Sequence, residues 1–186
     1  MPLKYKFIKQ RITYTGRELS SHWLYKNFNL QGDALVSFIG PAEVKDYLVD
    51  MVDRKEKKII RSSLMLHFMA EHFDLDLEKT ILRQRLLISL LAQEINRFSG
   101  TNVIDRRGND LYSKDRKLSV AIATLTPVST VFHVGLNILS SGTPVKTIGL
   151  RDLSISPRTL AIKILKLYSQ ELQAVNLSRV KVRAVG

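Results

Sequence analysis

The chain has 186 residues, of which 45% are hydrophobic, and a formal net charge of +12. That length and apolar content predict a single folded domain over residues 1–186, while the absence of cysteine excludes disulfides, thiolate metal sites and thiol nucleophiles. Residues 1–10 lack the apolar core of a secretory signal and no apolar run approaches the roughly 18 residues of a membrane span, so we expect a cytoplasmic protein without membrane contact.

The N-terminal part of the sequence alternates short apolar segments with turn residues. Residues 3–14 favour a strand or a strand pair, because aromatic and aliphatic residues alternate there with lysine and arginine. Residues 18–28 favour a short helix. Residues 34–39 form an apolar run that predicts a strand, and Gly40-Pro41 is expected to end it.

Two segments follow whose structure is less clearly marked by their pattern. Residues 43–61 are polar and basic, which favours an exposed loop. Residues 64–73 are an apolar run that fits a strand or a helix, because periodicity alone does not separate the two in so short a run.

The clearest element is a long helix over residues 77–98. Its first apolar face consists of Leu77, Ile81, Ile88, Leu91, Ala92 and Ile95. A second stripe of Leu82, Leu86 and Leu90 predicts burial on two sides, either within the domain or at a subunit contact, so we expect a homodimer. Gln84 lies within the first face and therefore needs a buried hydrogen-bond partner.

Beyond residue 101 the apolar residues alternate, which predicts a series of strands. The expected strands cover residues 103–106, 111–112, 117–124 and 130–139, with a tight turn at Gly108-Asn109. Ser156-Pro157 has the composition of a helix start, and the helix is expected to end before the basic tail, residues 179–183.

One short segment concentrates groups that can bind a ligand. Asn109 and Asp110 on a tight turn place an amide and a carboxylate at a strand edge, and Lys117 begins the next strand. A hairpin can hold the ammonium group near that pair, which suits a phosphate or an activated carboxylate with its metal. A simpler interpretation stays open, in which Lys117 is a strand-end lysine and the pair only forms a turn.

The same segment resembles the core of the lipoate protein ligases. That core reads Gly-Arg-Asn-Asp-Leu, then Lys-(Ile/Val)-Ser-Gly, then His-Gly. Here Asn109-Asp110-Leu111, Lys117-Leu118-Ser119 and His133-x-Gly135 follow in the same order with similar gaps, within a resemblance that covers residues 64–140. The whole chain is similar to a small family of uncharacterised archaeal and bacterial proteins in the superfamily that joins biotin and lipoate ligases with class II aminoacyl-tRNA synthetases.

The resemblance implies an α/β fold of the α+β type, with a mixed, largely antiparallel sheet flanked by helices. It implies that Lys117 is the catalytic residue, which grips the carboxylate being activated. Asn109 and Asp110 would position a phosphate and its Mg²⁺, with Asp110 as the metal ligand and ATP as the cofactor. The remaining expected substrate- or nucleotide-binding residues are Arg106, Arg107, Ser119 and His133.

Some of these residues have equally ordinary interpretations, and parts of the ligase pattern are absent. Arg106 and Arg107 also fit solvated charges, and His133 also fits a hydrogen-bonded core histidine. None of the nine glycines are adjacent, so the glycine-rich nucleotide loop of the ligases is missing. Gly108 stands where the ligases have arginine, and Val120 where they have glycine. The histidine spacing, without cysteine or an HExxH motif, does not indicate zinc.

Three functions are consistent with the sequence. The first is a ligase-like enzyme of acyl or adenylate transfer that binds a small carboxylate, acyl or nucleotide ligand and acts on an acidic acceptor domain. The second is an RNA- or tRNA-associated protein, because 29 lysines and arginines against 17 acidic residues attract polyanions. The third is a non-catalytic dimeric scaffold that uses the leucine stripe of the long helix.

Overall fold

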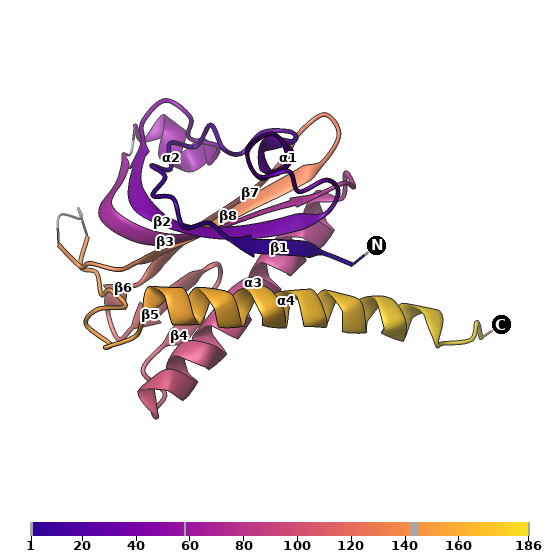
Figure 1. The fold of residues 1–186 in the computed structure, drawn as a ribbon. Coiled ribbons are helices and arrows are strands. Elements are labelled where there is room, and N and C mark those ends of the chain that lie inside the picture. The colour runs from indigo at the N-terminus through magenta and orange to yellow at the C-terminus, as the bar shows by residue number, and fades with distance from the viewer. Residues whose placement is uncertain (1, 58, 142–144, 186) are drawn as a thin grey trace.

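In the computed structural model, which describes residues 2–57, 59–141 and 145–185, the chain forms a five-stranded sheet with helices on both faces (Figure 1). The strand order is β1–β2–β3–β8–β7, with β1 parallel to β2 and the other neighbours antiparallel. These strands are β1 Lys4–Phe7, β2 Ala34–Val44, β3 Ile60–His72, β7 Ser119–Leu125 and β8 Thr130–Asn137. The mixed, largely antiparallel sheet implied by the resemblance is confirmed.

A smaller antiparallel sheet lies at one end of the large one. It consists of β4 Asp105–Arg107, β5 Asp110–Ser113 and β6 Arg116–Lys117. Leu118 joins it to β7, and its backbone N–H donates to the carbonyl of Leu111 in β5. The small sheet therefore presents the turn at Gly108-Asn109 beside the start of β7.

Two long helices cover one face of the large sheet, and two short helices lie over the other (Figure 1). The long helices are α3 Leu77–Ser99 and α4 Pro157–Val180, and the short ones are α1 Trp23–Phe28 and α2 Met51–Lys55. The C-terminal part of α4 runs past the edge of the sheet, where its residues are exposed (Figure 1). Among the described residues, no helix combines the length and apolarity that a membrane crossing requires.

Both faces of the central strands are buried, because neighbouring residues in a strand point to opposite sides. Leu66 and Phe68 face the cluster formed with α3 and α4, whereas Met65 and Met69 face a second cluster with Phe38. A strand that is buried on both sides reads as one continuous apolar run. The segment 64–73, which fits a strand or a helix by its sequence, is therefore part of a strand, which ends at His72.

The strand β2 does not end at Gly40-Pro41 as predicted. Its pairing with β3 continues to Val44, and the register shifts between Gly40 and Ala42. Such a β-bulge accommodates a proline that has no N–H to donate. Gly40 is also required by a close approach, because a Cβ atom there would lie 1.8 Å from the backbone oxygen of Ile12.

Three other sequence predictions in the N-terminal part need correction. The polar segment 43–61 contains the end of β2, helix α2 and the start of β3, so it is not an exposed loop throughout. The predicted strand over residues 3–14 is shorter, and beyond β1 only an isolated bridge from Tyr14 to Ala42 is formed in the described part. The first helix starts at Trp23, five residues later than predicted.

The predicted long helices are confirmed, with changes at their edges. The side chain of Asp76 caps α3 and that of Ser156 caps α4, each by accepting a hydrogen bond from a backbone N–H of the first turn. Helix α4 extends through Arg179 into the segment predicted as a tail. The leucine stripe, which is expected to be buried, becomes more exposed towards the start of α3, since Leu90 is 8% exposed and Leu82 is 59% exposed.

A buried hydrogen-bond chain ties α4 to the sheet. His72 Nδ1 lies 3.2 Å from Asp33 Oδ2, and His72 Nε2 lies 3.2 Å from the hydroxyl of Tyr168 on α4. Burial lowers the pKa of His72, so the ring is neutral, donates from Nδ1 to the carboxylate and accepts the tyrosine proton at Nε2. The side chain of His72, on the face covered by α3 and α4, thereby has hydrogen-bond partners for both ring nitrogens without water.

We predict that Gly40→Ala lowers the free energy of unfolding by at least about 2 kcal/mol, because the added methyl group collides with the backbone of Ile12 and forces a backbone shift. Urea denaturation of the purified variant measures this. Gly32→Ala is the matched control, since nothing lies within 4 Å of a Cβ there and only the strain of its φ of +89° opposes the substitution. Equal losses in the two variants would contradict the proposed close contact.

Candidate functional site

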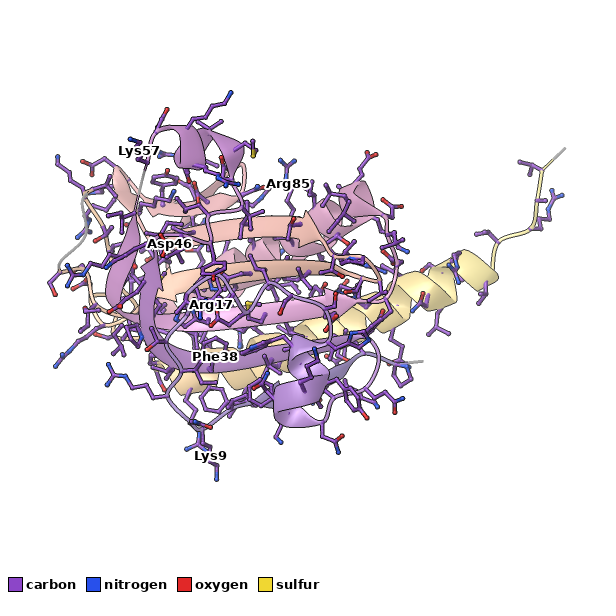
Figure 2. The ribbon with its side chains drawn as sticks, turned by 90° about the horizontal axis from the view of Figure 1, so that it is seen from above. Lys9, Arg17, Phe38, Asp46, Lys57 and Arg85 are labelled. Carbon is purple, nitrogen blue, oxygen red and sulfur yellow. The ribbon has the colours of Figure 1, made fainter. Side chains whose placement is uncertain are left out.

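An open cleft of about 1260 Å³ lies on the sheet face that carries the short helices. Figure 2 looks onto this face, with Lys57 beside α2 and α1 lying well apart from it. The cleft walls are mostly apolar side chains from the strands and from the loop after β2, among them Val44, Leu48, Met65, Val120 and Ile122. Polar and charged side chains also line it, among them Asp110, Lys117 and His133, so an amphipathic molecule matches its chemistry.

One end of the cleft carries an ion pair between Lys117 and Asp110. The distance from Lys117 Nζ to Asp110 Oδ2 is 2.7 Å, and the two side chains are 28% and 27% exposed. Both residues line the cleft. The prediction that the hairpin brings this ammonium next to the carboxylate is therefore confirmed as geometry.

The backbone of Lys117 is held from two sides, which fixes the point from which its side chain reaches the cleft. Lys117 pairs with Tyr112 in β5. On its other side the Lys117 N–H donates to the carbonyl of Lys146, and the Lys117 carbonyl accepts from Ile148. An ammonium on a rigid strand loses less conformational freedom on binding a ligand than one on a loop.

The turn before Asp110 is held by a residue from a helix. Gly108 has a φ of +62°. Two-residue hairpin turns require a positive φ, which glycine adopts without strain. Asn109 lines the cleft, and its Oδ1 accepts a hydrogen bond from Nε of Arg85 in α3 at 2.9 Å. No sequence pattern indicates Arg85, because a charged residue on the exposed side of a helix is usually solvated.

The other residues expected from the ligase pattern have different positions. Ser119 lines the cleft, but its Oγ accepts a hydrogen bond from the backbone N–H of Leu111 at 2.8 Å. Arg106 and Arg107 are exposed and are not among the lining residues. Arg106 donates to the carbonyl of Gly108, while Arg107 donates to the carbonyl of Lys114. The structure thus brings Asn109, Asp110, Lys117 and Ser119 together in the cleft lining, to which the two arginines do not belong.

His133 lies at the inner end of the cleft, in contact with a second histidine that the sequence did not indicate. His133 Nε2 is 2.9 Å from His67 Nδ1, and His67 Nε2 is 3.1 Å from the carbonyl oxygen of Gly40. The ring of Tyr14 stacks on His133 with 3.8 Å between centroids. These residues are 66 and 119 positions from His133 along the chain, and only the strand register and the N-terminal segment bring them together.

The buried amide of Gln84 finds a partner for its nitrogen in the backbone of His133, while its Oε1 accepts no hydrogen bond from the described residues. Gln84 Nε2 donates to the His133 carbonyl at 3.4 Å, from α3 across to β8. Within the described residues, no group of three or more histidine, aspartate or glutamate side chains is arranged to hold a metal ion. Two carboxylates of the hairpin line the cleft, and each is already paired, Asp110 with Lys117 and Asp115 with Lys146.

A family model described as a domain of unknown function, DUF366, matches residues 3–183. The chain belongs to this family. A solved structure of a protein of unknown function from Pyrococcus horikoshi has 38% sequence identity and a TM-score of 0.93, covering 99% of this chain and 100% of that one. An uncharacterised protein of Methanocaldococcus jannaschii is 40% identical over 156 residues, which are 80% of this chain and 70% of that protein.

More distant solved structures show which wider fold this DUF366 chain adopts. A putative lipoate protein ligase of T. acidophilum with bound lipoic acid has a TM-score of 0.61 at 11% identity, covering 90% of this chain and 86% of that one. The biotin protein ligase of Aquifex aeolicus in complex with biotin and ATP has a TM-score of 0.59 at 14% identity, covering 91% and 70%. The family therefore has the fold of the biotin and lipoate protein ligases.

We predict that the stability of this DUF366 protein falls as the pH drops from 6.5 towards 4. Burial lowers the pKa of His67 from 6.5 to about 4, and burial also lowers the pKa of His72 and His133. The unfolded chain binds these protons more readily, so the stabilisation is complete above pH 6.5 and is lost on acidification. Urea denaturation should show a loss on the order of 2 kcal/mol at pH 5 from His67 alone.

The carboxylate of Asp33 also has a lowered pKa, through its hydrogen bonds to His72 and Phe73 against the opposing effect of burial. Because its usual value is 3.8, its contribution is lost only below the window assigned to the histidines. An unchanged free energy of unfolding between pH 7 and pH 5 would contradict the neutral state of the buried histidines.

Proposed function

We propose that the protein binds a small carboxylate or acyl ligand in the cleft, with the Lys117 ammonium on its carboxylate or acyl carbonyl. The observation that carries the proposal is the Lys117–Asp110 ion pair at one end of a mostly apolar cleft. Two structures with the same fold are described as complexes, one with lipoic acid and one with biotin and ATP. An apolar cleft with a cation at one end suits an amphipathic acid of that general kind.

The ion pair is compatible with ligand binding because an ammonium group has three N–H donors. Asp110 accepts one of them and holds the side chain at the cleft, which leaves donors for a ligand oxygen. Asn109 is oriented through its carbonyl oxygen by Arg85, so its amide nitrogen stays available to donate. Ser119 supports the hairpin through the Leu111 N–H and has no part in the chemistry that we propose.

For the reaction we propose acyl transfer through an activated carboxylate, with Lys117 in the catalytic role. A positive group aimed at the acyl carbonyl or an adjoining phosphate stabilises the negative charge that develops there. ATP, when bound, would supply the phosphoanhydride that activates the acid. Mg²⁺ held by one carboxylate, that of Asp110, would enter with the nucleotide phosphates. A phosphate-binding role for Arg106 and Arg107 stays a prediction, because both lie outside the cleft lining.

We predict that Lys117→Met weakens the binding of lipoic acid or biotin roughly 10- to 100-fold, the usual loss for one charged hydrogen bond. Differential scanning fluorimetry with lipoic acid, biotin and Mg-ATP measures the rise in melting temperature. Lys166→Met is the matched control, because it removes the same charge from an exposed position of α4 on the opposite side of the sheet. A wild-type protein that responds to none of these compounds would sink the proposal.

The charge of the chain supports a second proposal, an association with RNA such as tRNA or with an acidic acceptor domain. If RNA binds, the affinity for bulk tRNA in a gel-shift titration should fall steeply between low and high salt, because bound phosphates release counterions. Binding that is absent or insensitive to salt would exclude it.

A homodimer through the exposed Leu82 end of the leucine stripe also remains our proposal, and sedimentation of the same samples tests it.

A further inference from the structure

The inner end of the cleft contains two histidines on neighbouring strands that face the same side of the sheet. The register pairs His67 of β3 with Gly135 of β8, and His133 of β8 with Met69 of β3, so the two histidines are diagonal neighbours. Gly135 leaves room for the rings, since a Cβ atom there would lie 3.1 Å from His133 Cε1 and 2.9 Å from Met65 Cε. Neither ring has freedom to turn, because Tyr14 stacks on His133 and Phe38 stacks on His67.

The protonation state of each ring nitrogen follows from Gly40, the last acceptor in the series of hydrogen bonds that joins His133, His67 and Gly40. The carbonyl oxygen of Gly40 can only accept, so His67 Nε2 carries the hydrogen that lies between them. Burial lowers the pKa of both histidines, and the adjoining His67 lowers that of His133 further, so both rings are neutral. His67 Nδ1 is then an acceptor, and His133 Nε2 donates to it. His133 Nδ1 is left without a hydrogen.

A nitrogen without a protein partner, on a residue that lines the cleft, is the atom of His133 that a ligand can use. His133 is 2% exposed and is among the lining residues. No described residue makes a hydrogen bond to Nδ1. The fully buried side-chain atoms without a partner do not include it, so Nδ1 keeps some exposure to solvent. It is therefore a fixed, uncharged acceptor at the end of the cleft away from Lys117. The first half of β7, from Ser119 to Ile122, separates the two ends, because Ile122 is the register partner of His133.

We propose that His133 Nδ1 accepts a hydrogen bond from the ligand, and that the site selects acids whose far end carries an N–H or O–H donor. This inference rests on the proposed function, in which Lys117 binds the carboxylate end. His67 and Gly40 act as positioning groups, because they impose the tautomer that makes Nδ1 an acceptor. A purely apolar far end would bury this acceptor without a partner, which a site built around a hydrogen bond disfavours strongly.

The tautomers can be measured without any ligand. We expect ¹⁵N–¹H imidazole spectra at neutral pH to show both His67 and His133 as neutral rings with the hydrogen on Nε2. Signals are assigned by comparison with His133→Phe and His67→Phe. A hydrogen on Nδ1 of His133, or a charged ring in the pair, overturns the inference whatever the ligand is.

Two matched pairs of acids test the selection itself by isothermal titration calorimetry. Octanoic acid and 8-hydroxyoctanoic acid differ only by a terminal hydroxyl, and lipoic acid and biotin share a pentanoate chain but only biotin has ring N–H donors. We expect the donor-bearing member of each pair to bind wild-type protein at least roughly tenfold more tightly. His133→Phe should abolish the preference, while Lys117→Met should weaken both members alike.

The outcomes separate the two proposals. Equal affinity within both pairs overturns the role of His133 and leaves the carboxylate site intact. Failure of all four acids to bind overturns both proposals. The comparison between acids needs only the wild-type protein, so the inference is decided even if His133→Phe does not fold.

Discussion

The burial of both faces of the central strands is the constraint on which the rest of the structure depends. Strands β3 and β8 lie between the two long helices on one side and the N-terminal segment on the other. Most polar groups in the buried parts of these strands therefore need a protein partner, because water does not reach them. His72 does so with Asp33 and Tyr168, and His67 does so with His133 and Gly40. The first set anchors α4, and the second shapes the end of the cleft.

The cleft exists because the covering of the second face is incomplete. Helices α1 and α2 are short and lie apart, whereas α3 and α4 run across the whole opposite face (Figures 1 and 2). The small sheet of β4, β5 and β6 closes one end of the gap and delivers Lys117 and Asp110 to it. The face that packs less tightly is thus the face that offers a ligand an apolar surface with polar ends.

Much of the fold was predictable from the sequence, and the errors have identifiable causes. The long helices and their caps follow from local periodicity and from Asp76 and Ser156 at their starts. The strand end placed at Gly40-Pro41 was wrong because a bulge accommodates proline at a position that local sequence marks as a stop. The short helix α2 was missed because it buries none of its residues, so no apolar stripe marks it.

Part of the candidate site was also predictable from the sequence, and part was not. Asp110 and Lys117 were predictable as near neighbours, because the short hairpin pairs Lys117 with Tyr112, and Asp110 lies two residues before Tyr112 on the same side of the strand. Arg85, Tyr14 and His67 were not, since their contacts with the site arise from the packing of distant elements. His67 lies 66 residues from its hydrogen-bond partner, and only the register of β3 with β8 joins them.

The sequence by itself determined the local elements, the hairpin with its opposite charges, and the absence of thiol chemistry. These depend on interactions within a few residues, whose geometry the chain carries in its turn and helix signals. The tertiary structure alone decided which histidines meet, which tautomer they adopt, and that Arg106 and Arg107 do not line the cleft. Such outcomes depend on strand register and on burial, and both arise only when segments far apart in the chain pack against each other.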